Sequence, residues 1–467
     1  MPSSSLLIMW WSNRSQPSLF VLLPLFMIAV FGSLTTEALD EEYQFSKINL
    51  IDVANLSTSV ALHSAKLRAT KFQLTVQPWE RRQGGEEVRR PRSTENGSES
   101  AERFVSVNGS CFALGRRFFP AIGWNTYTLI EQAAQIPVGS FAFNYSCSGR
   151  RQVTDMFDAA VAAGFNTVRT WAYSVGENQS FQVAPGEYYE PLFQGLDWVI
   201  QQASLRDIKL ILVFTDYWEY NGGVAQYLDW AGSRARTKND FFSNSKCKMM
   251  YKNNIQRILE RINTYTGVRY RHDKSIMAWE LINEPRCRNC PEELQDWLEE
   301  MAHFVKFLDR THLLSTGEEG FYSIGSGGSV DANPEVWSLT TGQDFVANHA
   351  IPEIDFAVAH LWPDNWGVFT LGLPASFSET WLVKHKSDSR AILGKPFLLE
   401  EFGTTGNGQL SAVDQVGSRF ATTAERAPRS VAVAEFYRSI FKQVELDNEN
   451  EYAIAGDISY SNTPVSR

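Results

Sequence analysis

The stretch Ile276-Met-Ala-Trp-Glu-Leu-Ile-Asn-Glu-Pro285 joins an apolar run to a glutamate at its end. A second stretch, Pro396-Phe-Leu-Leu-Glu-Glu-Phe-Gly403, has the same form and places Glu401 where the first places Glu284. Short apolar runs of this kind are typical of buried parallel strands. Two strand-end carboxyl groups also match the needs of glycoside hydrolysis, in which one protonates the leaving oxygen and the other attacks or stabilises the sugar carbon.

The rest of the sequence repeats this strand pattern, with amphipathic segments between the runs, as expected for β-α units. A chain of 467 residues could hold two or three domains, but one α/β (β/α)8 TIM barrel would also fill most of it, and we favour the single barrel. Polar or aromatic residues follow the runs, which predicts an active site at that face. The expected strands are residues 118–124, 165–171, 209–214, 276–281, 313–316, 354–359, 396–400 and 452–455, and the expected helices include 153–163, 192–203, 253–265, 292–308 and 431–445.

The N-terminal part of the chain has a different character. Residues 1–38 contain Arg14, an apolar run over 19–32 and small residues near Ala38, which predicts a cleaved signal peptide, with an uncleaved anchor as the alternative. Residues 39–101 are charged and rich in Gly, Pro and Ser, and we interpret them as a flexible polar leader. The catalytic domain is then expected over residues 102–467.

On a secretory route, two further features of the sequence become chemically relevant: the N-glycosylation sequons and the cysteines. Asn-x-Ser sequons occur at Asn55, Asn96, Asn108, Asn144 and Asn178. On that route disulfides are the default interpretation of the five cysteines, and Cys287 and Cys290 are spaced for a local bond. Half a zinc site or a redox pair is less well supported, and no second CxxC or nearby His pair completes a tetrahedral zinc set.

Composition narrows the substrate class. A net charge of -10 argues against a nucleic-acid partner, so an uncharged polymer fits better. Aromatic residues make up 13% of the chain, with 14 Trp. Most Trp side chains pack in protein cores, but sugar rings also stack on indole faces. The seven His are scattered without an HExxH spacing, so we predict no metal and no cofactor.

Several motifs in order resemble plant-type endo-β-1,4-mannanases of glycoside hydrolase family 5, over about residues 104–447. They are Gly123-Trp-Asn-Thr-Tyr, Gly164-Phe-Asn-Thr-Val-Arg-Thr-Trp-Ala, Tyr251-Lys-Asn-Asn-Ile, the stretch from Ile276 to Cys287, Gly317-Glu-Glu-Gly-Phe-Tyr and Gly342-Gln-Asp-Phe. The resemblance implies a secreted cell-wall enzyme that cuts internal β-1,4-mannosidic bonds in mannan, glucomannan and galactomannan.

By the same resemblance, Glu284 is the acid/base and Glu401 the nucleophile of a retaining mechanism. Retention needs carboxyl groups about 5 to 5.5 Å apart, so we expect the charge of Glu401 to raise the pKa of Glu284 until Glu401 is glycosylated. Glu400 is a competitor for the inward position on a strand of period two. The family's Glu-Phe-Gly motif selects Glu401.

The resemblance also assigns binding residues. Arg169 would hold a carboxylate ionised, Asn283 would bind the sugar 2-hydroxyl, and His360 would contact the sugar or the nucleophile. The alternatives for these three are a surface ion pair for Arg169, an N-cap or turn role for Asn283 and a buried structural role for His360. The candidate sugar-stacking residues are Trp124, Trp171, Trp218, Trp362 and Trp366.

Two departures from the family keep alternatives open. Trp362 stands where many members have a tyrosine, and residues 457–467 replace a tryptophan-bearing strand end and a closing helix, so we expect a truncated eighth strand and helix. The alternatives are a β-1,4-glucanase or mannan transglycosylase using the same carboxylates, or a degenerate barrel that binds mannan without cutting it. Polymer preference, oligomeric state and the full disulfide map stay open.

Overall fold

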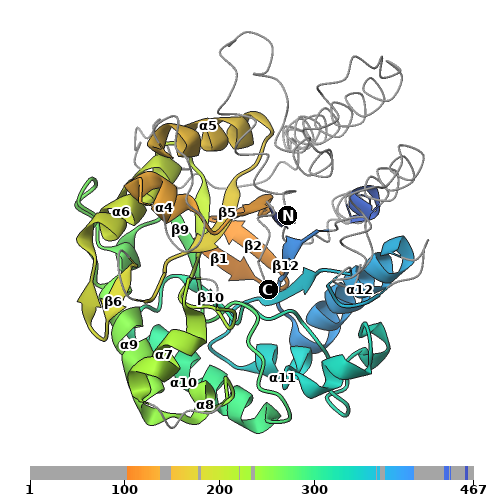
Figure 1. Cartoon of the computed structure of the whole chain (residues 1–467). Helices are drawn as coiled ribbons and strands as arrows, with labels where there is room; N and C mark the ends of the chain where they lie inside the picture. The colour runs from red at the N-terminus through yellow and green to blue at the C-terminus, as the bar shows by residue number, and fades with distance from the viewer. Residues whose placement is uncertain are drawn as a thin grey trace, which may run out of the picture.

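A ring of eight strands forms the centre of the molecule in the computed structural model (Figure 1). The structure describes residues 103–136, 149–176, 180–219, 221–232, 237–363, 365–368, 374–403, 436–440, 442 and 458–460. The ring strands are β4 (Gly123–Asn125), β5 (Thr167–Trp171), β8 (Lys209–Val213), β9 (Ile276–Glu280), β10 (Leu313–Ser315), β11 (Ala357–Leu361), β12 (Phe397–Phe402) and β13 (Ile458–Tyr460).

Hydrogen bonding links these strands in barrel order. Six of them form one parallel sheet in the order β10-β9-β8-β5-β4-β13, and β11 pairs in parallel with β12. The seam between β10 and β11 carries the backbone bonds Asp355 N to Leu314 O, 2.8 Å, and His360 N to Glu319 O, 3.1 Å. At the other seam β12 contacts β13 and β4. The (β/α)8 barrel is confirmed.

Helices cover the outside of the ring. Every residue of β5, β8, β9, β11 and β12 is buried, because one face of each strand meets a helix and the other meets the barrel interior. On β5, for example, Val168 packs outward in the main apolar core while Arg169 points inward. The described helices are α4 (Leu129–Ala134), α5 (Gly149–Ala162), α6 (Glu190–Ser204), α7 (Gly223–Ala231), α8 (Asp240–Ser243), α9 (Ser245–Leu259), α10 (Pro291–Leu308), α11 (Phe345–Ala350) and α12 (Pro374–Asp388). Residues 436–440 are also helical. Shorter 3-10 turns occur at Tyr270–His272, Val330–Ala332 and Val336–Thr340, and a π turn occurs at Ser389–Leu393.

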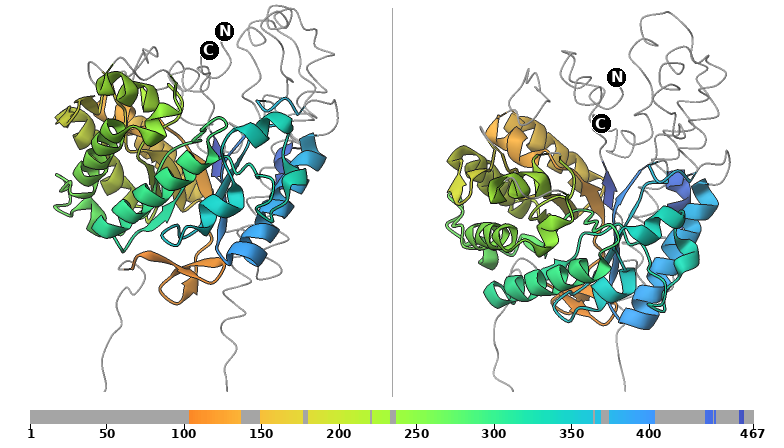
Figure 2. Two further views of the ribbon diagram at one scale, coloured as in Figure 1. Left: turned by 90° about the horizontal axis from the view of Figure 1, so that it is seen from below. Right: turned by 60° about the horizontal axis from the view of Figure 1, so that its bottom comes forward.

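A small antiparallel sheet closes one end of the barrel. It consists of β1 (Val105–Asn108), β2 (Cys111–Leu114) and β3 (Arg117–Phe118), drawn in orange in Figure 2. Its apolar side chains, Phe112 among them, share a cluster with barrel residues such as Ile211 and Met277. The cluster lies where the ring strands begin, so the opposite end is left for the active site. A second hairpin, β6 (Gln182–Ala184) with β7 (Glu187–Tyr188), follows β5.

Seven of the eight expected strands overlap strands of the ring. The eighth strand, expected to be truncated, is present as β13, pairing Ile458 with Gly123 through Tyr460 with Asn125. It follows the predicted stretch 452–455, which lies outside the described residues. The expected helix 253–265 was placed too late, because α9 ends at Leu259 and the chain then turns. Most of the expected helix 431–445 also lies outside the described residues.

The N-terminal predictions remain untested by the structure. The signal peptide and the polar leader, residues 1–101, lie outside the described residues. Within the part of the chain that is described, no helix is both long and apolar enough to cross a membrane.

Replacement of Trp297 by alanine should destabilise the barrel wall by about 3 to 5 kcal/mol. The Trp297 ring is fully buried on α10 and contacts Phe241, Phe242 and Tyr251 of α8 and α9. Urea unfolding followed by circular dichroism measures the change. The control is Phe307→Ala on the same helix, where the side chain is 70% exposed and the expected loss is within about 0.5 kcal/mol. Equal losses in both variants would contradict the packing described for α10.

Candidate active site

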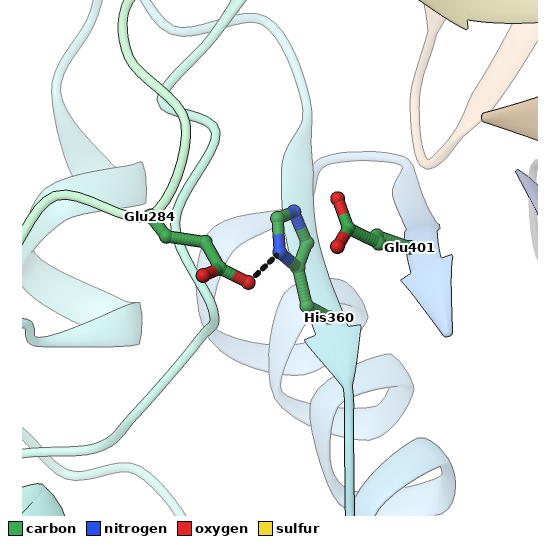
Figure 3. A group of neighbouring side chains, drawn as sticks. All are labelled: Glu284, His360 and Glu401. Carbon is green, nitrogen blue, oxygen red and sulfur yellow. Dashed lines mark hydrogen bonds and ion pairs between the residues drawn. The ribbon is translucent and has the colours of Figure 1, made fainter. Parts of the chain in front are cut away.

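Glu284, His360 and Glu401 converge at the carboxyl end of the barrel (Figure 3). Glu284 lies just beyond β9, His360 is on β11 and Glu401 is on β12. One carboxylate oxygen of each glutamate and one ring nitrogen of His360 all lie within 4.8 Å of one another. The structure therefore brings together the two glutamates that the sequence singled out.

The backbone at Glu284 is unusual. Its φ of 49° lies in the left-handed region, which non-glycine residues rarely occupy. The amide of Glu284 donates to the carbonyl of Gly317 at 2.7 Å, which ties this turn to the loop after β10. The turn directs the carboxylate sideways towards β11 and β12 instead of leaving it in line with β9.

The Glu284 carboxylate has two hydrogen-bond donors. Trp218 donates its indole Nε1–H to Oε2 at 2.5 Å, and Nδ1 of His360 lies 2.8 Å from Oε1. Burial favours the neutral acid, but the His360 cation, with Arg286 and Trp218, outweighs burial and lowers the pKa of Glu284. Burial would also lower the pKa of His360, yet the bonded Glu284, the neighbouring Glu400 as an acceptor and the charge of Glu401 raise it to about 10.

The Glu401 carboxylate has three donors of its own. Trp362 Nε1 donates to Oε1 at 3.0 Å, while Arg169 and Asn125 donate to Oε2 at 3.2 and 3.4 Å. Burial and the charge of Glu284 raise the pKa of Glu401 to about 7, against the opposing effects of His360, Arg169 and Trp362. The rise that the sequence predicted for Glu284 thus falls on Glu401, because His360 pairs with Glu284.

Arg169 links the nucleophile to a residue that sequence analysis did not select. Its guanidinium Nε and Nη2 pair with both oxygens of Glu280, with Nε to Oε2 at 2.9 Å, while Nη1 bonds Asn125 at 3.0 Å and reaches Glu401. All of these groups are buried, so the surface ion pair considered for Arg169 is excluded. A glutamate inside an apolar strand, as in Trp279-Glu280-Leu281, was the signal that could have identified Glu280.

Asn283 is fixed on both sides. Its Oδ1 accepts from Arg169 Nη2 at 2.8 Å, and its Nδ2 donates to Asp216 Oδ1 at 2.9 Å. Burial raises the pKa of Asp216 to about 7, although the bond from Asn283 opposes this. The amide of Asn283 is therefore oriented before any sugar binds.

Glu400 also points into the barrel. The register between β11 and β12 slips by one residue, so that Ala359 faces Leu399 while His360 faces Glu401. Glu400 is the extra residue of this bulge, and its carboxylate lies 3.7 Å from Arg169 and 3.9 Å from His360. The premise that only one of Glu400 and Glu401 could face inward was wrong, because a bulge breaks the period of two.

The tryptophans divide into site and core residues. Trp218 lies at the rim with 36% of its surface exposed, and Trp362 bonds the nucleophile. Trp171 is buried beneath them, with the Arg169 guanidinium 4.9 Å above its ring. Trp124 does not face the site: it packs outward against Phe157 and Phe165, because Asn125 takes the inward position on β4.

Trp366 is likewise a core residue. Its ring packs against Phe321 and Trp381 beneath α12, and only 3% of its surface is exposed. Its prediction as a sugar-stacking residue is wrong for the same reason as that of Trp124, since proximity to a strand end does not say which way a side chain points.

Arg286 packs against Trp218, the exposed tryptophan at the edge of the site. Its guanidinium lies 5.0 Å from the Trp218 ring and 5.2 Å from the Trp337 ring, and it forms an ion pair with Glu319. The cation therefore holds the indole that bonds Glu284. Neither Arg286 nor Glu319 was among the predicted site residues, although both lie in motifs that the sequence analysis quoted.

A model of the GH family 5 beta-mannosidase-like family matches residues 102–467. This chain belongs to glycoside hydrolase family 5. A mannan endo-1,4-beta-mannosidase 7 of Arabidopsis thaliana is 42% identical over 308 residues, which cover 64% of this chain and 68% of the relative. A mannan endo-1,4-beta-mannosidase 1 of Oryza sativa subsp. japonica is 36% identical over 379 residues, covering 77% and 83%.

A solved structure has a similar fold. The endo-beta-1,4-mannanase from Thermotoga petrophila aligns with a TM-score of 0.59 at 27% identity, covering 74% of this chain and 68% of that one. In this family 5 chain, Cys287 and Cys290 form the predicted disulfide, three residues beyond Glu284, at the start of α10.

The converging atoms could also be considered as metal ligands. Among the described residues, Glu284, His360 and Glu401 are the one group of acidic, His or Cys side chains spaced to hold a metal ion. Both carboxylates are already occupied by indole, imidazole, guanidinium and amide donors. The arrangement is that of a hydrogen-bonded acid pair.

Replacement of Glu284 by glutamine should lower the pKa of Glu401 from about 7, because the negative charge of Glu284 contributes to the rise. A nucleophile reacts when ionised, so attack should begin at lower pH in Glu284→Gln than in the wild type. The pH dependence of covalent trapping by a dinitrophenyl 2-deoxy-2-fluoro-mannoside measures this midpoint, since that leaving group needs no acid. An unchanged or higher midpoint would contradict the coupling of the two carboxylates.

Proposed function

We propose that this chain is a secreted, retaining endo-hydrolase of internal β-1,4-mannosidic bonds in mannan, glucomannan and galactomannan of the cell wall. The observation that carries the proposal is the pair Glu284 and Glu401 in a family 5 barrel, with one carboxylate oxygen of each within 4.8 Å of the other. The mannan substrate is supported by the relatives, several of which are named mannan endo-1,4-beta-mannosidases.

The separation of the carboxylates favours retention. Inverting enzymes hold them about 6.5 to 9.5 Å apart to leave room for a water molecule, whereas retaining enzymes need about 5 to 5.5 Å. In the retaining sequence Glu284 gives a proton to the glycosidic oxygen while Glu401 attacks the anomeric carbon. Glu284 then takes a proton from water, whose oxygen displaces Glu401 from the sugar.

The retaining reaction requires Glu284 to be protonated and Glu401 to be ionised when the glycosidic bond breaks. Because the pKa of Glu284 is lowered and that of Glu401 is raised to about 7, the single proton of the resting pair lies on Glu401 below about pH 7, and both groups are ionised above it. Glu284 must then receive its proton from another group. His360 is placed to supply it, because its Nδ1 lies 2.8 Å from Glu284 and its pKa is raised to about 10.

The site residues also bear on the degenerate-barrel alternative. Each carboxylate has a set of donors that fixes its orientation, which a binding module would not need. Trp362, in place of tyrosine, still donates to Glu401 through its indole N–H. Both features support catalysis over simple binding.

Secretion is supported by sequence and by one structural feature. The N-terminal residues have the form of a signal peptide, and the Cys287–Cys290 disulfide suits an oxidising compartment. Passage through such a compartment also fits an extracellular polysaccharide substrate.

The test is release of reducing ends from galactomannan by the purified chain, beside carboxymethyl cellulose as the glucanase substrate. The wild type should cut galactomannan, and Glu401→Gln should lower kcat by 10³-fold or more with an unchanged melting temperature. Proton NMR of the first product should show the β anomer. A folded wild type that cuts neither polymer would support the binding-only barrel, cleavage of cellulose alone would support the glucanase, and an initial α anomer would exclude retention.

A further inference from the structure

Glu400, His360 and Glu284 form a line of three groups across the site. Nδ1 of His360 lies 2.8 Å from Glu284, and its Nε2 faces Oε2 of Glu400 at 3.9 Å. Glu400 occupies this position because of the β12 bulge, which turns it inward beside the nucleophile. The imidazole thus bridges the acid/base and a second, wholly buried carboxyl group.

The facing atoms lack hydrogen bonds to the described residues, although Oε2 of Glu400 also lies 3.7 Å from Nε of Arg169. Among the described residues, neither His360 Nε2 nor either oxygen of Glu400 has a hydrogen-bond partner. Buried polar groups without partners are costly, so their persistence next to one another calls for a reason. A gap of 3.9 Å is about 1 Å longer than a hydrogen bond, and catalytic hydrogen bonds often shorten only when substrate binds.

The surrounding charges decide the state of Glu400. It faces Arg169 from β5, Glu280 from β9, His360 from β11 and Glu401 on its own strand. Arg169 is already paired with Glu280 and Glu401. Burial and the charge of Glu280 raise the pKa of Glu400 to about 8, against His360 and Arg169, which favours the uncharged acid at neutral pH.

The imidazole, by contrast, faces mostly acidic groups. Glu284, Glu400 and Glu401 surround it, and Glu318 and Glu319 approach from the loop after β10. If Glu400 were also ionised, its charge would hold the extra proton on the ring. A neutral Glu400 removes that attraction and leaves the proton free to move to Glu284.

We propose that Glu400 is a positioning residue for the acid/base, an uncharged carboxylic acid whose carbonyl oxygen accepts the Nε2–H of His360 and so frees Nδ1 to pass its proton to Glu284. The proton leaves Nδ1 and binds Oε1 of Glu284, and the ring becomes neutral with its hydrogen on Nε2. Glu284 then protonates the glycosidic oxygen. In the second half, water gives a proton to Glu284 as its oxygen displaces Glu401 from the sugar, and Glu284 passes that proton back to Nδ1 of His360, which restores the imidazolium and the ionised Glu284.

The test separates proton delivery from general damage, and it rests on the proposed mannanase activity. The measured quantity is kcat/KM, which reports the glycosylation step, for mannopentaose and for a dinitrophenyl β-mannotrioside that needs no acid. Glu400→Leu should lose tenfold or more on mannopentaose and threefold or less on the dinitrophenyl substrate. Glu400→Gln keeps a neutral acceptor and should stay within about threefold of the wild type on both.

The matched control is Glu131→Leu. Glu131 on α4 is also buried, its carboxylate lacks a hydrogen-bond partner among the described residues, and burial raises its pKa to about 8. It lies outside the site, so both rates should be unchanged. Equal losses of Glu400→Leu on both substrates, no loss on either, or a Glu400→Gln as impaired as Glu400→Leu would each overturn the proposal.

A spectroscopic measurement tests the same point without activity. In the wild type and in Glu400→Gln, NMR of ¹⁵N-labelled histidine at pH 7 should show the Nε2 proton of His360 shifted downfield by a hydrogen bond to the side-chain carbonyl oxygen at position 400. The absence of that shift in the wild type would overturn the proposal even if Glu400→Leu failed to fold, and so would an equal shift in a folded Glu400→Leu. A wild type that is inactive on both substrates but shows the shifted proton would refute the proposed function and leave the hydrogen bond from His360 to Glu400 in place.

Discussion

Burial of the Arg169 charge is the constraint on which the site depends. One guanidinium inside the barrel is shared by Glu280, Glu400 and Glu401, and it also fixes the amides of Asn125 and Asn283. Each further carboxylate near one buried cation makes the next one costlier to ionise. Burial and neighbouring charge accordingly raise the pKa of Glu400 to about 8 and that of Glu401 to about 7. The network that neutralises Arg169 thus also prepares the catalytic pair.

The backbone contributes two irregularities to this arrangement. A regular β12 would point only one of its consecutive glutamates inward, and the bulge opposite His360 brings both to the site. A regular end of β9 would carry Glu284 along the strand axis, whereas its left-handed turn directs the carboxylate across the barrel mouth. The helical shell and the small sheet β1–β3 hold the strands on which these irregularities occur, since their side chains pack against the opposite faces and the opposite end.

Sequence analysis predicted the barrel and its two glutamates because both leave local signals. Buried parallel strands such as β8 and β9 are continuous apolar runs, and strand-end polar residues follow them. It could not predict which way Trp124 and Trp366 point, since that depends on strand boundaries a residue or two away. The bulge at Glu400 and the pairing of His360 with Glu284 were also out of reach, because both depend on the register between distant segments. Glu280 was detectable as a charge within an apolar strand, but its partner on β5 was not.

The left-handed conformation of Glu284 has an evolutionary consequence. A non-glycine residue with a positive φ raises the energy of the folded state by about 1 to 2 kcal/mol, and glycine relieves that cost while asparagine reduces it. Substitution of Glu284 by glycine or asparagine would therefore stabilise the fold but abolish the acid/base, and only selection for catalytic turnover keeps the glutamate. Copies of such a gene that are released from that selection could lose catalysis first and keep the barrel, which is one route from enzymes of this kind to inactive sugar-binding descendants.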